Sequence, residues 1–286
     1  MKRSKLTIAA AIFLLSVQCL PAQNPYKPQV VEYISADTVD TAILKIQYSM
    51  TFRGLYENDP QRLTDTRTVW VGRHVRKDSS YWMDKREAEN LILREKGKML
   101  YMTTESTVYP IDVMISGGKA TMLQRTLMNG PILRYEVGAS PFGWNFQPGD
   151  TVILGHRCKR AVAAYKGRSY EAWYAEDVPV GAGPYLFDGL PGLILKITSA
   201  DGDYSWEATG LEESDEPIVV KDYGSKVKPC AYGEARKIME NVYKHPYQYA
   251  RQFVRSIRVR DASGGTREAG EKEFAISFFY NPIEVE

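Results

Sequence analysis

The chain has 286 residues, with 37 basic and 35 acidic side chains and a formal net charge of +2. This near-neutral balance argues against a partner that is held by a broad basic field, such as a nucleic acid or an anionic membrane surface. The length permits one large β domain as readily as two small domains.

The first residues have the pattern of a secretory signal peptide. Three basic residues, Lys2, Arg3 and Lys5, precede an apolar run over residues 6–15, and small and polar residues surround Ala22. This three-part order predicts a signal peptide over residues 1–22 that is cleaved after Ala22, and the run is too short to serve as a membrane anchor. We therefore expect a periplasmic or secreted protein.

Removal of residues 1–22 deletes three basic residues and no acidic ones, so 37 − 3 = 34 basic groups face 35 acidic groups and the net charge becomes −1. Cys19 raises the alternative of a lipid anchor, but the preceding Ser16, Val17 and Gln18 match the usual acylation pattern poorly. We expect no lipid anchor and, because no later apolar run is long enough, no transmembrane segment in the mature chain.

Patterns of short strands dominate the first half of the mature chain. Over residues 30–54, Ile46, Tyr48, Met50 and Phe52 alternate with polar or small neighbours, which predicts a half-buried strand. Further strands are predicted over residues 68–75, 79–84, 98–106, 108–115 and 131–138. Residues 85–97 could form either a helix or a strand.

Residues 152–209 have the pattern of an antiparallel meander. A turn at 166–168 separates two strands, and the second places Tyr170, Ala172 and Tyr174 on one face and Glu171 and Trp173 on the other. Strands over 193–199 and 204–209 flank the pair Asp201-Gly202, which favours the left-handed geometry of tight β-turns.

A helical pattern follows Pro229. Apolar side chains at three- and four-residue spacing between residues 235 and 243 predict an amphipathic helix that breaks at Pro246 and resumes to Ser256. Residues 261–273 read as a polar loop and residues 274–286 as a final strand. We expect one mainly β (β-rich α+β) domain over residues 23–286, with a curved antiparallel sheet or partly open barrel and a C-terminal helical segment packed on it.

The segment FDGLPGLILKI, residues 187–197, forms a corner rich in glycine and proline. Glycine tolerates positive φ and proline fixes φ, so the segment over residues 181–192 predicts successive tight turns. The aromatic rings nearby are those of Trp173, Tyr174, Tyr185 and Phe187. Either they plug the end of a β core, or they line the mouth of a binding cavity.

The stretch from Trp144 to Ile197 resembles the GLPGLI family of exported Bacteroidetes proteins. The residues at the family's positions are Gly155, Cys158, Ala161, Gly167, Arg168, Trp173, Tyr174, Pro179, Gly183, Pro184, Phe187, Gly189, Leu190, Pro191, Gly192, Leu193 and Ile194. His156 and Tyr185 replace aromatic residues that are common in the family, which puts any role of those two rings in doubt. The resemblance implies an exported protein and no established activity.

Two cysteines, Cys158 and Cys230, remain after signal-peptide cleavage. In an oxidising compartment they could form a disulfide, which would stabilise the fold by about 4 kcal/mol in the chain-entropy model. Two separate buried thiols are the alternative, and the sequence does not decide between them.

Familiar catalytic motifs are absent from the sequence, including phosphate-binding loops, HExxH and GxSxG. His156 and Cys158 share a strand face, but a lone pair is weak evidence for a metal, and we expect neither a metal nor a cofactor. Glu176 and Asp177 could belong to a carboxylate-dependent hydrolase, although a solvated loop is the simpler reading.

These observations favour a non-catalytic protein of the cell envelope that binds an apolar small molecule, a lipid or an envelope partner, and no nucleic acid. A hydrolase that uses the carboxylates near Glu176 is the first alternative. A structural or interaction component of an outer-membrane assembly is the second.

Overall fold

The computed structural model describes residues 24–127, 129–139, 142–254, 258–260, 266–268 and 277–285, with the side chains of 258–260 and 266 left aside. The expected signal peptide and Cys19 lie outside the described residues. Within them, no helix combines the length and the hydropathy needed to cross a membrane.

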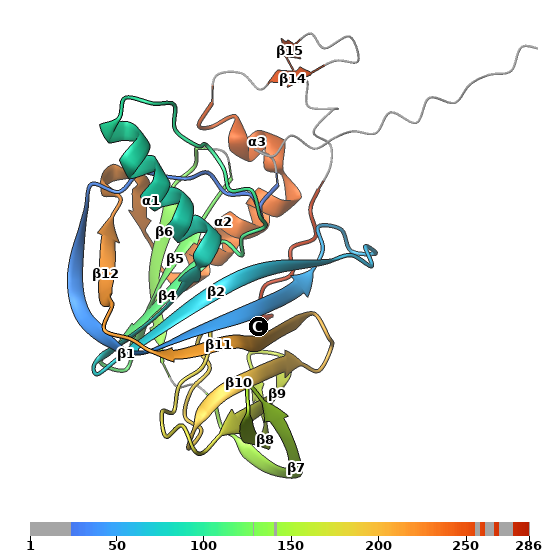
Figure 1. Cartoon of the computed structure of the whole chain (residues 1–286). Coiled ribbons are helices and arrows are strands. Elements are labelled where there is room, and N and C mark those ends of the chain that lie inside the picture. The colour runs from blue at the N-terminus through green and yellow to red at the C-terminus, as the bar shows by residue number, and fades with distance from the viewer. Residues whose placement is uncertain are drawn as a thin grey trace, which may run out of the picture.

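Most of the chain forms one large open sheet (Figure 1). Its strands are β1 (Ser35–Arg53), β2 (Arg62–Gly72), β3 (Val75–Ser80), β4 (Ile111–Ser116), β5 (Lys119–Arg125), β6 (Ile132–Gly138), β7 (Asn145–Ile153), β8 (His156–Tyr165), β9 (Arg168–Ala175), β10 (Leu193–Ser199), β11 (Tyr204–Glu213), β12 (Pro217–Asp222) and β13 (Val227–Pro229). They follow the order β13-β6-β5-β4-β3-β2-β1-β11-β10-β9-β8-β7, with β12 paired to β1 outside this path. A separate small pair joins β14 (Arg258–Arg260) and β15 (Thr266–Glu268).

The predicted mainly β fold is confirmed, in the form of an open sheet that does not close into a barrel. The sheet is mixed, because β13 runs parallel to β6 while the other named pairs are antiparallel. β1 is long enough to serve two partners on one side: residues 35–41 pair with β12, and residues 44–52 pair with β11.

Period-two alternation was a reliable signal in β1. Ile46, Tyr48, Met50 and Phe52 all point into the main core and are at most 1% exposed. Both predicted hairpins are also present, since β8 and β9 meet at Lys166-Gly167 and β10 and β11 meet at residues 200–203.

In the described part of the chain, α1 (Tyr81–Glu95) packs against β2 and β3, and α2 (Tyr232–Lys244) is followed by the short α3 (Pro246–Ala250), which packs against it. The predicted C-terminal helical segment is confirmed, and α2 packs against β6 (Figure 1). The helix breaks at Pro246 as expected, because proline lacks the amide donor that would continue the ladder. The expected continuation to Ser256 reaches outside the described residues.

The strand expected over residues 79–84 is right only for Ser79 and Ser80, which end β3, and the strands expected over residues 98–106 and 274–286 are wrong wherever the structure describes them. Residues 81–84, which were included in a strand, open α1, since the buried Met83, Glu87 and Asn90 recur at helical spacing. Residues 98–106 form an irregular connection and residues 277–285 an irregular terminal segment. In these last two segments, side-chain contacts and isolated backbone hydrogen bonds outweighed the local β propensity.

The terminal segment is fastened by such contacts. The Tyr170 hydroxyl donates to the Ile283 carbonyl at 3.0 Å, and Tyr165 and Lys166 donate to Glu284 at 3.1 and 3.0 Å. These bonds satisfy the backbone and the buried carboxylate without a strand ladder.

Candidate functional site

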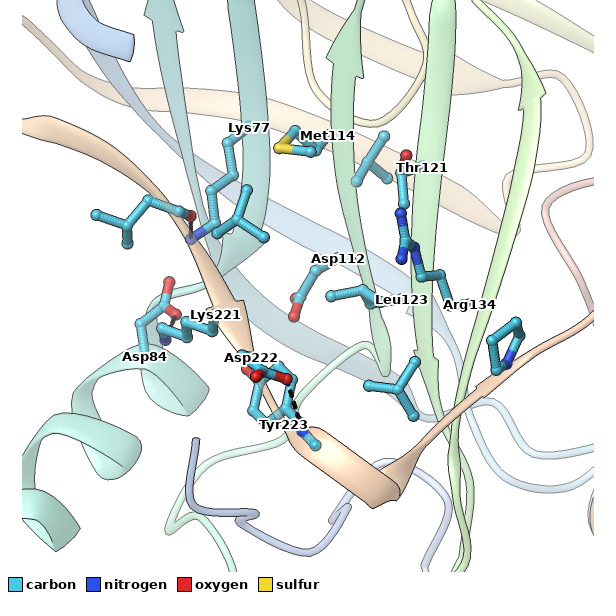
Figure 2. Close-up of a pocket in the computed structure, with 16 residues that line it drawn as sticks. Lys77, Asp84, Asp112, Met114, Thr121, Leu123, Arg134, Lys221, Asp222 and Tyr223 are labelled. Atoms are coloured by element: carbon cyan, nitrogen blue, oxygen red, sulfur yellow. Dashed lines mark hydrogen bonds and ion pairs between the residues drawn. The ribbon is translucent and has the colours of Figure 1, made fainter. Parts of the chain in front are cut away.

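The segment over residues 217–229, which we call the strap, crosses the outer face of the sheet. It comprises β12, the 3₁₀ turn η2 (Gly224–Lys226) and β13. Its two ends are fixed by pairing, β12 with β1 and β13 with β6, so the middle must pass over β3, β4 and β5. A pocket of about 450 Å³ lies beneath it (Figure 2).

The pocket walls are mainly apolar, with charged groups placed around them. The apolar lining residues are Val113, Met114, Leu123, Val219, Val220, Val227 and Pro229, and the polar ones are Lys77, Asp84, Asp112, Thr121, Arg134, Lys221, Asp222 and Tyr223. A pocket of this size that combines apolar walls with polar groups is typical of small-molecule sites.

Strand alternation places these side chains on the outer face. Ala120, Met122 and Leu133 point into the main core, so their neighbours Thr121, Leu123 and Arg134 point away from it and under the strap. In the same way Asp112 and Met114 on β4 project into the pocket (Figure 2).

A chain of ion pairs forms one end of the pocket. Lys221 of the strap contacts Asp84 at 2.5 Å and Glu87 at 2.7 Å, both on α1. Arg125 on β5 contacts Glu87 at 3.0 Å and Asp112 at 2.5 Å. This chain ties the strap, the helix and the sheet together around the pocket.

The same charges set the protonation of Asp84. Burial by itself raises the pKa of this carboxyl, but the ammonium groups of Lys221 and Lys77 more than offset that effect and hold the pKa well below its usual range. The Lys221 pKa moves the opposite way: burial lowers it, and Asp84 and Glu87 bring it well above its ordinary value.

Replacing Asp84→Asn is expected to lower the free energy of unfolding at pH 7 by about 2 kcal/mol. A carboxyl whose pKa is depressed by folding contributes stability above its unfolded pKa of about 4, and this contribution is lost as the pH falls further. The difference in the free energy of unfolding between wild type and variant should therefore shrink at low pH, as measured by denaturant titrations from pH 7 to pH 2. The exposed Asp150→Asn is the control and should leave the curve nearly unchanged; a difference that stays constant with pH would contradict the assignment.

The aromatic corner lies in the main core, away from this pocket. Phe187 is 0% exposed, and its ring centroid lies 4.9 Å from those of Phe142 and Tyr170 and 5.3 Å from that of Trp206. Tyr185 is also buried and donates its hydroxyl to Glu284 at 3.2 Å. Of the two interpretations of these rings, this packing supports the plug of a β core.

Trp173 and Tyr174 point to opposite faces of β9, as alternation predicts, so the four rings do not converge on one cavity. Trp173 is half-buried and donates its indole N–H to Glu171 at 3.0 Å. Tyr174 is buried, with its ring centroid 6.2 Å from that of the exposed Phe146.

Buried charged side chains on β3 bind the backbone of the corner, and we call these contacts the clamp. Asp78 on β3 accepts the Tyr185 backbone N–H at 2.6 Å, and Arg76 donates to the Phe187 carbonyl at 3.1 Å. Arg76 also lies 3.6 Å from the Asp188 carboxylate. Tyr185 has φ of +52°, a strained value that this clamp holds in place.

The glycines of the motif allow close backbone approach. A Cβ at Gly192 would lie 2.1 Å from the Ala175 carbonyl oxygen, and one at Gly183 would lie 2.9 Å from the Phe187 carbonyl oxygen. The other motif residues divide into buried Pro184, Leu190, Leu193 and Ile194 and exposed Gly189 and Pro191. Sequence reasoning identified a structural corner here.

Cys158 and Cys230 are both free thiols, so the disulfide alternative is not the arrangement seen. Cys158 lies on β8 and Cys230 directly follows β13, toward opposite ends of the strand order. Burial raises the pKa of both thiols, which disfavours the thiolate.

The carboxylates considered for hydrolysis are exposed and separately paired. Glu176 contacts Lys159 at 2.6 Å, and Asp177 contacts Nδ1 of His156 at 2.8 Å. The Cys158 thiol donates to the His156 carbonyl at 3.5 Å. Among the described residues, no three or more His, Cys, Asp or Glu side chains are grouped closely enough to hold a metal ion.

One family model matches part of the chain. Residues 144–196 match the family described as "Protein of unknown function (Porph_ging)". The matched region runs from Trp144 into β10 and contains the corner, whereas the strap and all the lining residues of the pocket lie outside it. No curated protein matches the chain.

Two solved structures of PNGF-II, in space groups P21 and C2, are similar to the chain at 16% sequence identity. They cover 70% of this chain, with TM-scores of 0.45 and 0.46. The chain spans about a third of their length, with 33% and 32% covered. Similarity at this level gives no information on function.

The pocket beneath the strap was missed by sequence reasoning. Its lining comes from α1, four strands and the strap, and no local motif links them. The one available signal was the alternation of Thr121 and Leu123 with core residues, but such a pattern equally fits a solvent-facing strand.

Proposed function

We propose that the protein is an exported, non-catalytic member of the GLPGLI family that binds a small amphipathic molecule beneath the strap. The observation that carries the proposal is the 450 Å³ pocket, with apolar walls and charged groups that converge from separate elements. The expected signal peptide over residues 1–22 supports a location in the periplasm or outside the cell.

The strap is held in place over the pocket by contacts within the protein. The strap is held over the outer face by strand pairing at both ends and by buried ion pairs between Lys221 and α1. Such a frame keeps the apolar walls apart, so a ligand gains contact area without ordering a disordered surface. The separately paired carboxylates near Glu176 favour this binding role over hydrolysis.

Filling the pocket should weaken binding strongly. Leu123→Trp places a large ring under the strap, and the neutral dye N-phenyl-1-naphthylamine serves as the probe. We expect saturable 1:1 fluorescence enhancement with wild type and at least tenfold weaker binding with the variant, because the added ring occupies the apolar volume.

Val152→Trp is the matched control, since Val152 is 68% exposed on the edge strand β7. Circular dichroism and the melting temperature establish that both variants fold. The proposal fails if wild type shows no saturable binding, or if folded Leu123→Trp binds the dye as well as the control does.

A further inference from the structure

The carboxylates of the pocket already have protein partners. Asp84 is paired with Lys221, and Asp112 accepts a hydrogen bond from Arg125 at 2.5 Å. The third, Asp222, is exposed and accepts the backbone N–H of Gly224 at 2.8 Å. The second oxygen of Asp112 accepts no hydrogen bond within the described part of the chain, but it lies 4.0 Å from a guanidinium nitrogen of Arg67. Asp112 therefore sits between two guanidinium groups, and a cationic ligand would meet their repulsion.

Two cations of the pocket, Lys77 and Arg134, form no close ion pair with any described carboxylate, in contrast to Lys221 and Arg125. The Lys77 ammonium still interacts with Asp84, whose pKa it lowers, and lies 5.5 Å from the centre of the Trp70 ring. The Lys77 ammonium donates one hydrogen bond, to the Val219 carbonyl at 3.1 Å, and an ammonium has three donors. Arg134 is exposed at the β6 side of the pocket, and the N–H donors of its guanidinium are available to a ligand.

These cations flank an apolar surface. Figure 2 shows Lys77 beside Met114, and Arg134 below Thr121 with Leu123 next to it. Val227 and Pro229 of the strap complete the wall on the Arg134 side. An anionic group at Arg134 would thus have an apolar body directed under the strap.

We propose that the ligand is an amphipathic anion with a carboxylate head, bound by the Arg134 guanidinium, with Lys77 as a second cation across the pocket. The guanidinium fork matches a carboxylate bidentately, and the apolar walls accept an aliphatic body. This inference rests on the proposed function, because it assigns the ligand class of the same pocket.

Calorimetric titration with decanoate, decanol and decylamine, each below its micelle-forming concentration, tests the head group with the chain length held constant. We expect decanoate to bind wild type most tightly. Arg134→Gln should weaken the binding of decanoate about tenfold to a hundredfold, because a charge-assisted hydrogen bond is lost. The affinity for decanol should change by no more than about twofold. Lys77→Gln, which keeps a donor for the Val219 carbonyl, should weaken the binding of decanoate less than Arg134→Gln does.

The exposed Arg157→Gln on β8, whose partner is Asp150, is the matched control and should leave all three affinities unchanged. The inference is overturned if decanol or decylamine binds as tightly as decanoate, if decanoate fails to bind, or if Arg134→Gln has no selective effect. Dye binding that is still lost in Leu123→Trp would then leave the proposed function standing, whereas absence of dye binding to wild type would remove both.

Discussion

Replacing Phe187→Ala is expected to lower the free energy of unfolding by about 3–5 kcal/mol, the usual cost of truncating a fully buried aromatic ring. Phe187 is 0% exposed and packs against Phe142, Tyr170, Tyr185 and Trp206. The neighbours are fixed on separate strands and loops, so they cannot collapse into the cavity left behind. Denaturant titration at neutral pH measures the loss.

Phe146→Ala is the matched control for that experiment. Phe146 is 63% exposed, so its truncation should change stability by less than about 1 kcal/mol. The folded fraction of Phe187→Ala should still bind the neutral dye, because the pocket lies on the other face of the sheet. Small destabilisation combined with lost dye binding would instead assign the ligand site to the corner.

Replacing Arg67→Met is expected to cost about 3–5 kcal/mol and to leave the protein barely folded. The Arg67 guanidinium contacts Asp78 at 2.8 Å and Asp65 at 3.2 Å and donates to the Ile111 carbonyl at 2.7 Å. All three charged side chains are nearly inaccessible to solvent. Without the guanidinium, the buried carboxylates of Asp65 and Asp78 lose the counter-charge that most offsets their burial.

The cost of Arg67→Met should shrink as the pH falls, because protonation removes the uncompensated charge of Asp65 and Asp78. The exposed Arg157→Met is the control and should be nearly neutral. Thermal and denaturant unfolding at pH 7 and pH 5 measure both effects. A loss below about 1 kcal/mol at pH 7 would contradict the role of Arg67 as the counter-charge of these buried carboxylates.

Much of the fold follows from local sequence signals. The alternation of Ile46, Tyr48 and Met50 predicted the core face of β1, and Asp201-Gly202 marked a hairpin that is present. These signals succeed because the side-chain period and the turn residue act within a few positions. The same signals were misleading for residues 277–285. Their composition favours a strand, but hydrogen bonds from distant side chains such as those of Tyr170 and Lys166 hold the segment in place without strand pairing.

The candidate site was less accessible to sequence reasoning. The glycines and prolines of the corner correctly predicted tight turns, but the packing of Phe187 depends on Trp206 and Phe142, which come from other segments. The pocket depends on the strap crossing over β4 and β5, which precede it by nearly a hundred residues. Such a crossing is a property of topology, and no short pattern encodes it.

The central claim is that the strap pocket receives the ligand while the motif corner serves the fold. Amide chemical shifts of the ¹⁵N-labelled protein, recorded during titration with decanoate, test it most directly. We predict saturable shifts in β4, β5 and the strap, including Leu123 and Val227, and small changes over residues 173–194. Shifts concentrated at Trp173 to Phe187, with the strap unaffected, would contradict the account.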